Sequence, residues 1–558
     1  MGPVMGGYDS VSRGSTCVRT GERDTQPSAP WWRALVTCAA LGLGGCMVGP
    51  DFQPPPAPNV GGYTPERRVT PTAAAETAGG ASQGFVTGLD IGGHWWTQFG
   101  SPQINAFVEE AVRNHPTIAS AEFALRAARE NVLQAQGALY PQALGEGSAT
   151  REQVPAAQGG TTGPASLYNL YNTSVNVTYT LDVFGGLRRQ VESQAAQAEN
   201  QRFQLEATYL ALTANVVTAA LTDASLKAQI AATQSIIKGE TDQLQRVRRQ
   251  FELGAVSQAD VLAQQATLAQ TEASLPLLQK QRAQGRNRLM AYLGRLPSED
   301  RGESVDLASL RLPSRLPLSL PADLVRQRPD IRQAEASLHQ MAASVGVSTA
   351  NMLPQFTLTP SAGTQSLSVP NLFSAESAAW ALAANIQQKL FDAGQLYHAK
   401  EYSVASFEQT YAAYQSTVIM AFQNVADSLR AIQYDAAMLK AQAVAEKAAL
   451  DSLKMVQEEF KVGATGYAII ITAQQTYQNA VIARIQAQAL RFTDTVALFQ
   501  SLGGGWWNRT DETARAAPRR AGYFQGPDGP ATAAVRDAAP PGTPAPAGAP
   551  PAVMEVTP

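Results

Sequence analysis

The residue whose chemistry the sequence defines most closely is Cys46. It follows Leu43-Gly44-Gly45 at the end of a short apolar stretch, Ala34 to Leu43, that Arg33 precedes. Such a stretch has the length of the hydrophobic region of a signal peptide. Small residues before a cysteine at this place predict cleavage there and transfer of a diacylglycerol group to the Cys46 thiol. The alternative is an ordinary signal peptide that contains an incidental cysteine.

Other residues give little basis for catalysis or metal binding. The remaining cysteines, Cys17 and Cys38, also lie near the N-terminus, which excludes a metal or disulfide framework built from cysteine in the body of the chain. The four histidines have no second ligand at metal spacing, and no catalytic triad, phosphate loop or dinucleotide fingerprint stands out. The histidines are His94, His115, His339 and His398. We therefore predict a protein that is not an enzyme and needs neither metal nor cofactor.

Composition excludes one further class of partner. The chain has 558 residues and a formal net charge of −3, and only 16% of its residues are charged. That balance gives no electrostatic reason to expect nucleic acid. The mean hydropathy is −0.16, and no apolar run reaches the roughly 20 residues of a spanning helix. Any crossing of a membrane would therefore have to use strands.

One long pattern occurs twice. Phe251-Glu252-Leu253-Gly254-Ala255 recurs as Phe460-Lys461-Val462-Gly463-Ala464, an offset of 209 residues (460 − 251 = 209), and Gly185 recurs as Gly394 at the same offset. Tyr140-Pro141-Gln142 is echoed by Leu353-Pro354-Gln355. We expect two repeats, each made of a strand pair, a long helix, a glycine-centred turn and a second long helix.

The strand signals are alternations of apolar and polar residues. From Asn172 to Asp182 the apolar residues Val175, Val177 and Tyr179 alternate with polar ones, and Trp380 to Leu390 behaves alike in the second repeat. Partner strands are expected near 143–150 and 356–361. Alternation over about ten residues is typical of a transmembrane β-barrel strand. A soluble sheet with one wet face gives the same pattern, so both interpretations remain.

The helical signals are apolar residues at steps of seven. They include Ile230, Ile237, Leu244 and Phe251 before the first turn, and Leu439, Leu453 and Phe460 before the second. A heptad repeat on both sides of a turn predicts an antiparallel coiled-coil hairpin. The first helix, of about 65 residues, would be close to 100 Å long. Such a helix requires lateral neighbours along its whole length.

These signals divide the chain. We expect a leader at 1–45, a lipid-modified Pro-rich tether at 46–93, the first repeat at 94–300, a linker at 301–328, the second repeat at 329–507 and a disordered Pro- and Ala-rich tail at 508–558.

In its repeats, its lipid-modification motif and several short motifs, the chain resembles the TolC-type outer-membrane efflux channels, in particular their NodT lipoprotein subfamily. The resemblance covers about residues 46–507. The motifs that carry it, besides the two turns, are Cys46 with Gly49-Pro50-Asp51-Phe52, Trp95-Trp96 with Phe99-Gly100, and Arg328-Pro329-Asp330-Ile331 with Ala334-Glu335.

The family fold is mainly α, with a membrane β-barrel. The resemblance implies a homotrimer in the outer membrane, in which four strands per chain form one twelve-stranded β-barrel continuous with a periplasmic α-barrel. It also implies a passive exit duct for drugs or other small molecules, supplied by a periplasmic adaptor protein and an inner-membrane pump. An alternative is the exit duct of a type I protein secretion system. A structural coiled-coil protein would explain the heptads but not the strands.

The resemblance also assigns candidate sites. The adaptor-contacting tips are Gly254, Ala255 and Val256 in the first repeat, and Gly463, Ala464 and Thr465 in the second. Carboxylates that often constrict the pore just after the second tip are replaced by Ile469 and Thr472, whereas Asp260 is kept in the first repeat. An apolar ring at Ile469 could gate by dewetting. Alternatively, these isoleucines pack between helices.

Overall fold

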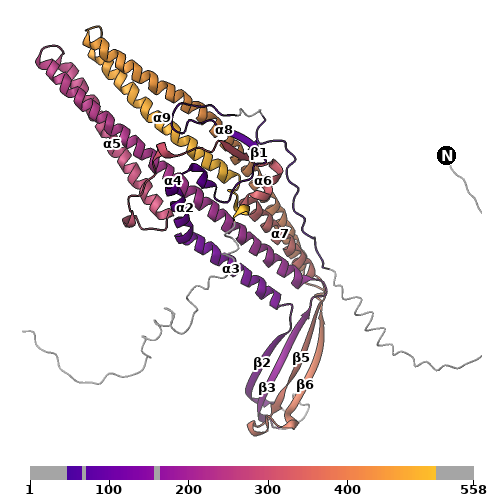
Figure 1. Cartoon of the computed structure of the whole chain (residues 1–558). Coiled ribbons are helices and arrows are strands. Elements are labelled where there is room, and N and C mark those ends of the chain that lie inside the picture. Colours follow the sequence, from indigo (N-terminus) through magenta and orange to yellow (C-terminus); the bar gives the residue numbers. More distant parts are fainter. Residues whose placement is uncertain (1–46, 66–70, 156–163, 510–558) are drawn as a thin grey trace, which may run out of the picture. The chain divides into compact units, whose positions relative to one another are not determined.

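The computed structural model describes residues 47–65, 71–155 and 164–509, in two compact units (Figure 1). The first unit holds the strands of both repeats, and its described residues are Met47–Gly49, Ala138–Arg189 and Gly346–Ala393 without the undescribed 156–163. The second unit holds most of the helices. The Cys46 site and most of the tail at 508–558 lie outside the described residues.

The first unit is a four-stranded antiparallel sheet in the order β2-β3-β5-β6. Its strands are β2 (Gln142–Val154), β3 (Ser166–Leu181), β5 (Gln355–Ser366) and β6 (Ala378–Gln387). Strand β3 pairs with β5, with Tyr171 opposite Ser366, so the strand pairs of the two repeats join into one sheet. The four strands lie where the alternation predicts them. Strand β6 leaves Trp380, Leu382 and Ile386 at least 69% exposed, so its apolar face is uncovered in a single chain.

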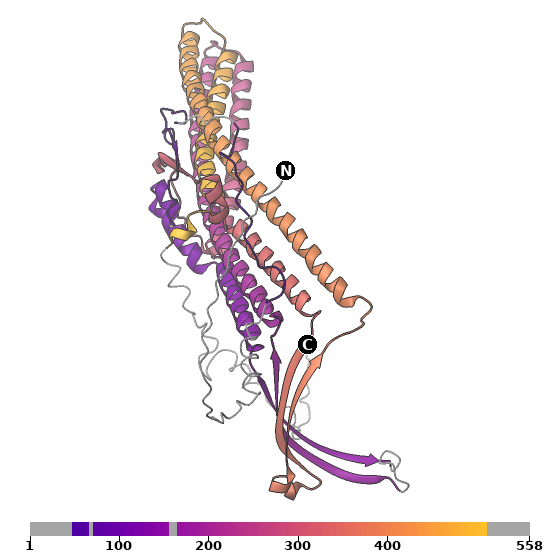
Figure 2. The ribbon, with the colours of Figure 1, turned by 90° about the vertical axis from the view of Figure 1, so that its right-hand side faces the viewer.

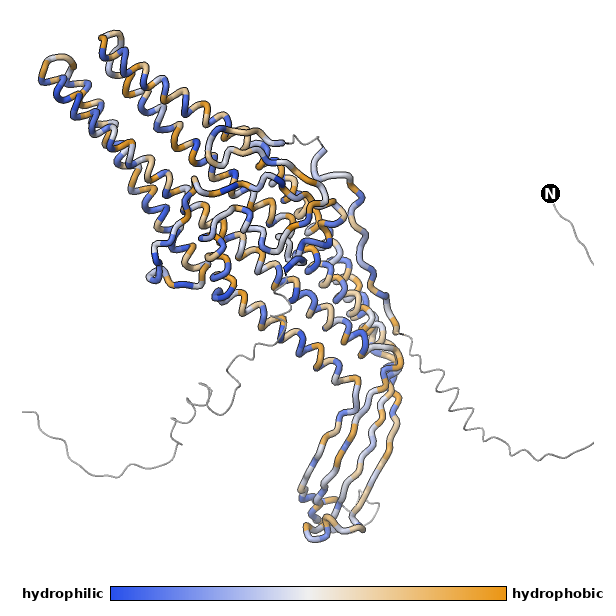
Figure 3. The backbone as a smooth tube through the Cα atoms, viewed as in Figure 1, coloured by the Kyte–Doolittle hydropathy of each residue, from blue (hydrophilic) through white to orange (hydrophobic). Residues whose placement is uncertain are grey.

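The second unit contains two long helical hairpins of equal dimensions. Helices α4 (Gly186–Glu252) and α8 (Gln395–Lys461) have 67 residues each, and α5 (Gln258–Tyr292) and α9 (Tyr467–Ser501) have 35 each. Shorter helices precede the strands: α2 (Pro102–Asn114), α3 (Pro116–Gly137), α6 (Pro321–Gln327) and α7 (Pro329–Ala350). Along the hairpins hydrophilic and hydrophobic residues intermix (Figure 3). Among the described residues, no helix has the length and hydropathy needed to span a membrane.

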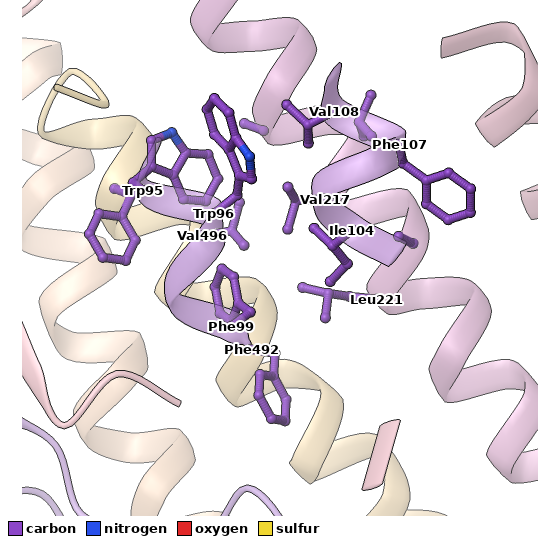
Figure 4. Close-up of a cluster of buried hydrophobic side chains, with 14 of the residues drawn as sticks. Trp95, Trp96, Phe99, Ile104, Phe107, Val108, Val217, Leu221, Phe492 and Val496 are labelled. Atoms are coloured by element: carbon purple, nitrogen blue, oxygen red, sulfur yellow. The ribbon is translucent and has the colours of Figure 1, made fainter. Parts of the chain in front are cut away.

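The main hydrophobic core lies where the hairpins meet the short helices. Trp95 and Phe99, in the short helix η1 (Trp95–Phe99), pack against Phe499 and Phe492 of α9, with ring centroids 5.4 Å and 6.2 Å apart. Helix α2 and α4 complete the cluster (Figure 4). In contrast, the first turns of α8 lie apart from the other helices of its unit (Figure 2), whereas Tyr414 and Val418 further along α8 pack with Ile331 of α7. Its exposed apolar residues include Tyr397, Tyr402, Ile419 and Met420.

The segments predicted as tether and linker are more ordered than those names suggest. Strand β1 (Gly84–Thr87) of the tether pairs in parallel with β4 (Arg315–Leu318) of the linker. Just before β1, the fully buried Gln83 accepts a hydrogen bond from Arg491 and donates one to the Pro313 carbonyl. Arg491 also donates to the carbonyls of Gly79 and Ala81, at 2.8 Å and 3.0 Å. Buried side-chain hydrogen bonds to the main chain thus order a segment that has no periodic signal.

Candidate functional site

The two hairpin tips are built alike. The first runs from Leu253 to Ser257, between α4 and α5, where Gly254 has φ +74° and the Ala255 N–H donates to the Gln250 carbonyl at 2.8 Å. At the second tip Gly463 has φ +75°, and the Ala464 N–H donates to Glu459 at 2.9 Å. This pattern ends a helix in the left-handed region that only glycine enters without strain. The sharp reversals are therefore fixed by the two glycines.

The tips expose apolar surface. Leu253 and Val462, directly before the two glycines, are 83% and 80% exposed. Of the predicted tip residues, Gly254, Ala255, Gly463 and Ala464 are exposed, whereas Val256 and Thr465 are half-buried. Each tip thus brings its three predicted residues together at the end of a hairpin (Figure 1). Uncovered apolar groups at such an end can be buried only by another molecule.

The three candidate gate residues differ in their surroundings. Ile469 is 51% exposed, while the next residue, Ile470, is 1% exposed and packs with Val247 and Tyr467. Thr472 is exposed and donates a hydrogen bond to the Ala468 carbonyl at 3.1 Å. Because Ile469 and Thr472 are three residues apart on α9, they share one face of the helix. Packing between helices within one chain therefore accounts for Ile470 but not for Ile469.

Asp260 has a structural role at the start of α5. Its carboxylate accepts hydrogen bonds from the Ser257 N–H and hydroxyl, at 2.9 Å and 2.7 Å, and the Ser257 hydroxyl accepts from the Asp260 N–H. This reciprocal arrangement is a capping box, which satisfies donors that the first turn of a helix leaves free. In the second repeat Gly466 occupies the N-cap without a side-chain hydrogen bond. Asp260 thus strengthens the first hairpin only.

A polar interface between the hairpins was not predicted. The Tyr467 hydroxyl of α9 donates to Gln264 of α5 at 2.7 Å, and burial raises the pKa of Tyr467 to about 12. Nearer the middle, Glu240 of α4 accepts from Thr271 of α5 and from Gln478 of α9. Burial also raises the pKa of Glu240. The heptads give no sign of this interface, because its residues lie between the apolar positions.

Over the described residues, no three histidine, cysteine or acidic side chains are grouped so that they could hold a metal ion. Of the four histidines, His339 pairs with Glu192 at 2.8 Å and stacks on Phe52, with ring centroids 4.4 Å apart.

The duplicated strand pairs and hairpins define a class of protein, the outer-membrane channels of efflux systems. The family model described as outer membrane efflux protein matches residues 107–295 and 320–504, and the chain belongs to this family. This match confirms the TolC-type resemblance. The chain is therefore an outer-membrane channel component of an efflux system.

Particular relatives agree with this class. The chain is 29% identical over 478 residues to the antibiotic efflux pump outer membrane protein ArpC of Pseudomonas putida, covering 85% of this chain and 96% of ArpC. It is 30% identical over 487 residues to the toluene efflux pump outer membrane protein TtgF of the same species, covering 86% and 98%. Among solved structures, the outer-membrane channel OprN matches with a TM-score of 0.75 and 26% identity, over 83% of this chain and all of OprN.

Proposed function

We propose that three copies of this chain form a passive exit duct that carries small molecules from a periplasmic adaptor and an inner-membrane pump across the outer membrane. The single observation that carries this proposal is the pair of equal hairpins with exposed apolar tips. A duct of this kind conducts solutes along a gradient that the pump maintains, so it needs no catalytic residue and no cofactor.

The uncovered surfaces of the single chain support the trimer. In the sheet, β2 and β6 are the outer strands of the described order, and each pairs with only one neighbour. Unpaired strand edges favour pairing with another chain, and closure into a barrel removes them. Three four-stranded sheets would give twelve strands. The exposed apolar residues of α8 likewise require a neighbour, which an adjacent protomer would supply.

The relatives support a small-molecule cargo. ArpC and TtgF are named for the efflux of antibiotics and of toluene. We therefore favour drugs or other small molecules as the cargo over the alternative, a type I protein secretion duct.

Two further parts of the proposal concern the candidate sites. We propose that Cys46 carries a lipid anchor, with palmitate among its acyl chains, and that the repeats extend over 94–300 and 329–507. We also propose that the tip residues contact the adaptor and that Ile469 and Thr472, together with Asp260 of the first repeat, border the constriction.

The tips provide the test. A photo-reactive amino acid at Ala255 or Ala464 should cross-link to the adaptor in cells that express the complete pump. A matched control is Leu277, which is 54% exposed on α5 but lies 23 residues beyond Gly254 (277 − 254 = 23). Equal adaptor cross-linking from Leu277 and from the tips would contradict contact at the tips.

A further inference from the structure

The residues directly after Cys46 are docked against the turn between β3 and α4. The Val48 N–H donates to the Phe184 carbonyl at 3.1 Å. The Arg189 guanidinium donates to the Val48 carbonyl at 3.1 Å and to the Gly49 carbonyl at 3.3 Å. These three hydrogen bonds involve only main-chain groups of the segment Met47–Gly49, which we call the post-cysteine segment. The turn therefore recognises the backbone of this segment.

The contact is closely packed and depends on glycines. Gly49 has φ +90°, and a Cβ there would lie 2.5 Å from the Cα of Gly346 on α7. A Cβ at Gly346 would lie 2.9 Å from the side chain of Arg189, which is itself 1% exposed. On the other side, a Cβ at Gly185 would lie 2.4 Å from the Met47 side chain. Side chains at Gly49 and Gly185 would push the post-cysteine segment away, and one at Gly346 would displace the Arg189 side chain that holds it.

The turn that holds the segment is itself rigid. The Asp182 carboxylate accepts the N–H groups of Leu187 and Arg188, at 2.9 Å and 3.0 Å, and also the Arg188 side chain. These charge-assisted hydrogen bonds tie the first turn of α4, which begins at Gly186, to Asp182, the residue that follows the end of β3 at Leu181. The Arg189 side chain thus projects from a fixed position.

The internal duplication supplies a natural comparison. At the offset of 209 residues Arg189 corresponds to His398 (398 − 189 = 209), while Gly185 corresponds to another glycine, Gly394. Helices α3 and α7 begin 213 residues apart (329 − 116 = 213), so Gly346 corresponds to Leu133 (346 − 213 = 133), which is 58% exposed. The turn glycine is kept in both repeats. By contrast, Arg189 and Gly346, which form the contact with the post-cysteine segment, are not repeated, because His398 and Leu133 stand at the corresponding positions.

We propose that this turn, with Gly346, is a dock for the chain that follows the lipid-modified cysteine, and that it fixes where the lipid enters the membrane. Consecutive Cα atoms are about 3.8 Å apart, so docking of Met47 would keep a lipid on the preceding residue, Cys46, close to the dock. The diacylglycerol group then enters the bilayer beside the end of β3 that leads into α4. This proposal rests on the lipidation of Cys46 and on an outer-membrane sheet.

The dock can be tested with a diazirine analogue of methionine at position 47 of the full-length chain, in cells. Irradiation should cross-link position 47 to peptides that contain residues 182–189. Gly49→Ala should lower that yield about tenfold, because it forces a Cβ against Gly346 at a positive φ. It changes only the docked segment, so the sheet and helices fold as before. The matched control is Gly61→Ala, where a Cβ would meet open space, and its yield should equal that of the unmodified sequence.

Substitutions in the dock provide the reciprocal arm. Arg189→His installs the residue of the other repeat and should lower the yield similarly, whereas His398→Ala should leave it unchanged. Cross-links that map away from residues 182–189, or a yield that Gly49→Ala does not change, would overturn the dock. Palmitate labelling of the same samples separates the two proposals. Cross-linking without palmitate label would support the docked position of the segment and contradict the lipid anchor. Palmitate label without cross-linking would contradict the dock.

Discussion

Two adjacent isoleucines on α9 allow the apolar constriction to be tested with a built-in control. Ile469 is 51% exposed in the single chain, whereas Ile470 is 1% exposed against Val247 and Tyr467. The perturbation is Ile469→Asp, compared with Ile470→Asp. The two changes introduce the same side chain one residue apart, but they should act through different physical effects.

The magnitudes follow from burial. Full burial of an isoleucine side chain stabilises a protein by about 1.5–3 kcal/mol, so the half-exposed Ile469 contributes roughly half of that per chain. Truncation of a fully buried isoleucine such as Ile470 costs about 2–5 kcal/mol, and a buried carboxyl group adds a desolvation penalty. We therefore expect Ile469→Asp to leave trimer assembly intact and Ile470→Asp to reduce it.

The effect of Ile469→Asp on conduction should then appear in assembled protein. Three carboxylates at one level of the pore would wet an apolar constriction and repel one another. Single-channel conductance of purified trimers in planar bilayers should rise, and cells should become more sensitive to large antibiotics. Normal assembly with unchanged conductance would refute the apolar gate, and loss of assembly in Ile469→Asp would show that Ile469 packs between helices of neighbouring protomers.

Three further predictions concern other parts of the chain. Cys46→Ser should abolish palmitate labelling and leave the precursor uncleaved, and label that persists in the variant would contradict the lipid anchor. In β3, Val177→Arg should cost roughly 2–4 kcal/mol per chain if it faces lipid near mid-bilayer, and Thr178→Arg less; equal trimer yields would argue against the barrel. Burial, followed by the hydrogen bond and charge of Asp494, raises the pKa of Asp435 to about 7. Because the folded form then holds its proton more tightly, stability falls as pH rises from about 4 to 7. Asp435→Asn should therefore raise the melting temperature much more at pH 8 than at pH 4, and equal shifts at both pH values would contradict this.

The sequence was sufficient to predict the helices and strands that occur in both repeats. The heptads ending at Phe251 and Phe460 predict helices that the structure ends at Glu252 and Lys461. The alternation in 172–182 predicts a strand, and β3 extends from Ser166 to Leu181. Periodic burial places apolar residues at each helical turn or at every second strand residue, so helices and strands can be predicted without knowing which segments they contact. The two tips could also be predicted, because a sharp reversal of the chain favours a glycine at positive φ.

The parts that were not predicted are single contacts between residues far apart in the chain. Gln83 pairs with Arg491 across 408 positions, and Arg189 reaches Val48 across 141. Neither contact produces a periodic pattern in the sequence, so the tether and the linker were interpreted as Pro-rich connections. Glu240 was missed for a related reason, since a buried polar residue between heptad positions has the sequence appearance of a solvated one.

The most direct test of the exit duct is the rate at which cells expel a fluorescent substrate of the pump that this chain serves. In cells with pump and adaptor present, deletion of the gene for this chain should abolish efflux of the dye. The unmodified gene should restore efflux, and a variant with Leu253 and Val462 both changed to Asp should assemble in the outer membrane but fail to restore it. Dye efflux that continues at the same rate without this chain would contradict its role as the exit duct.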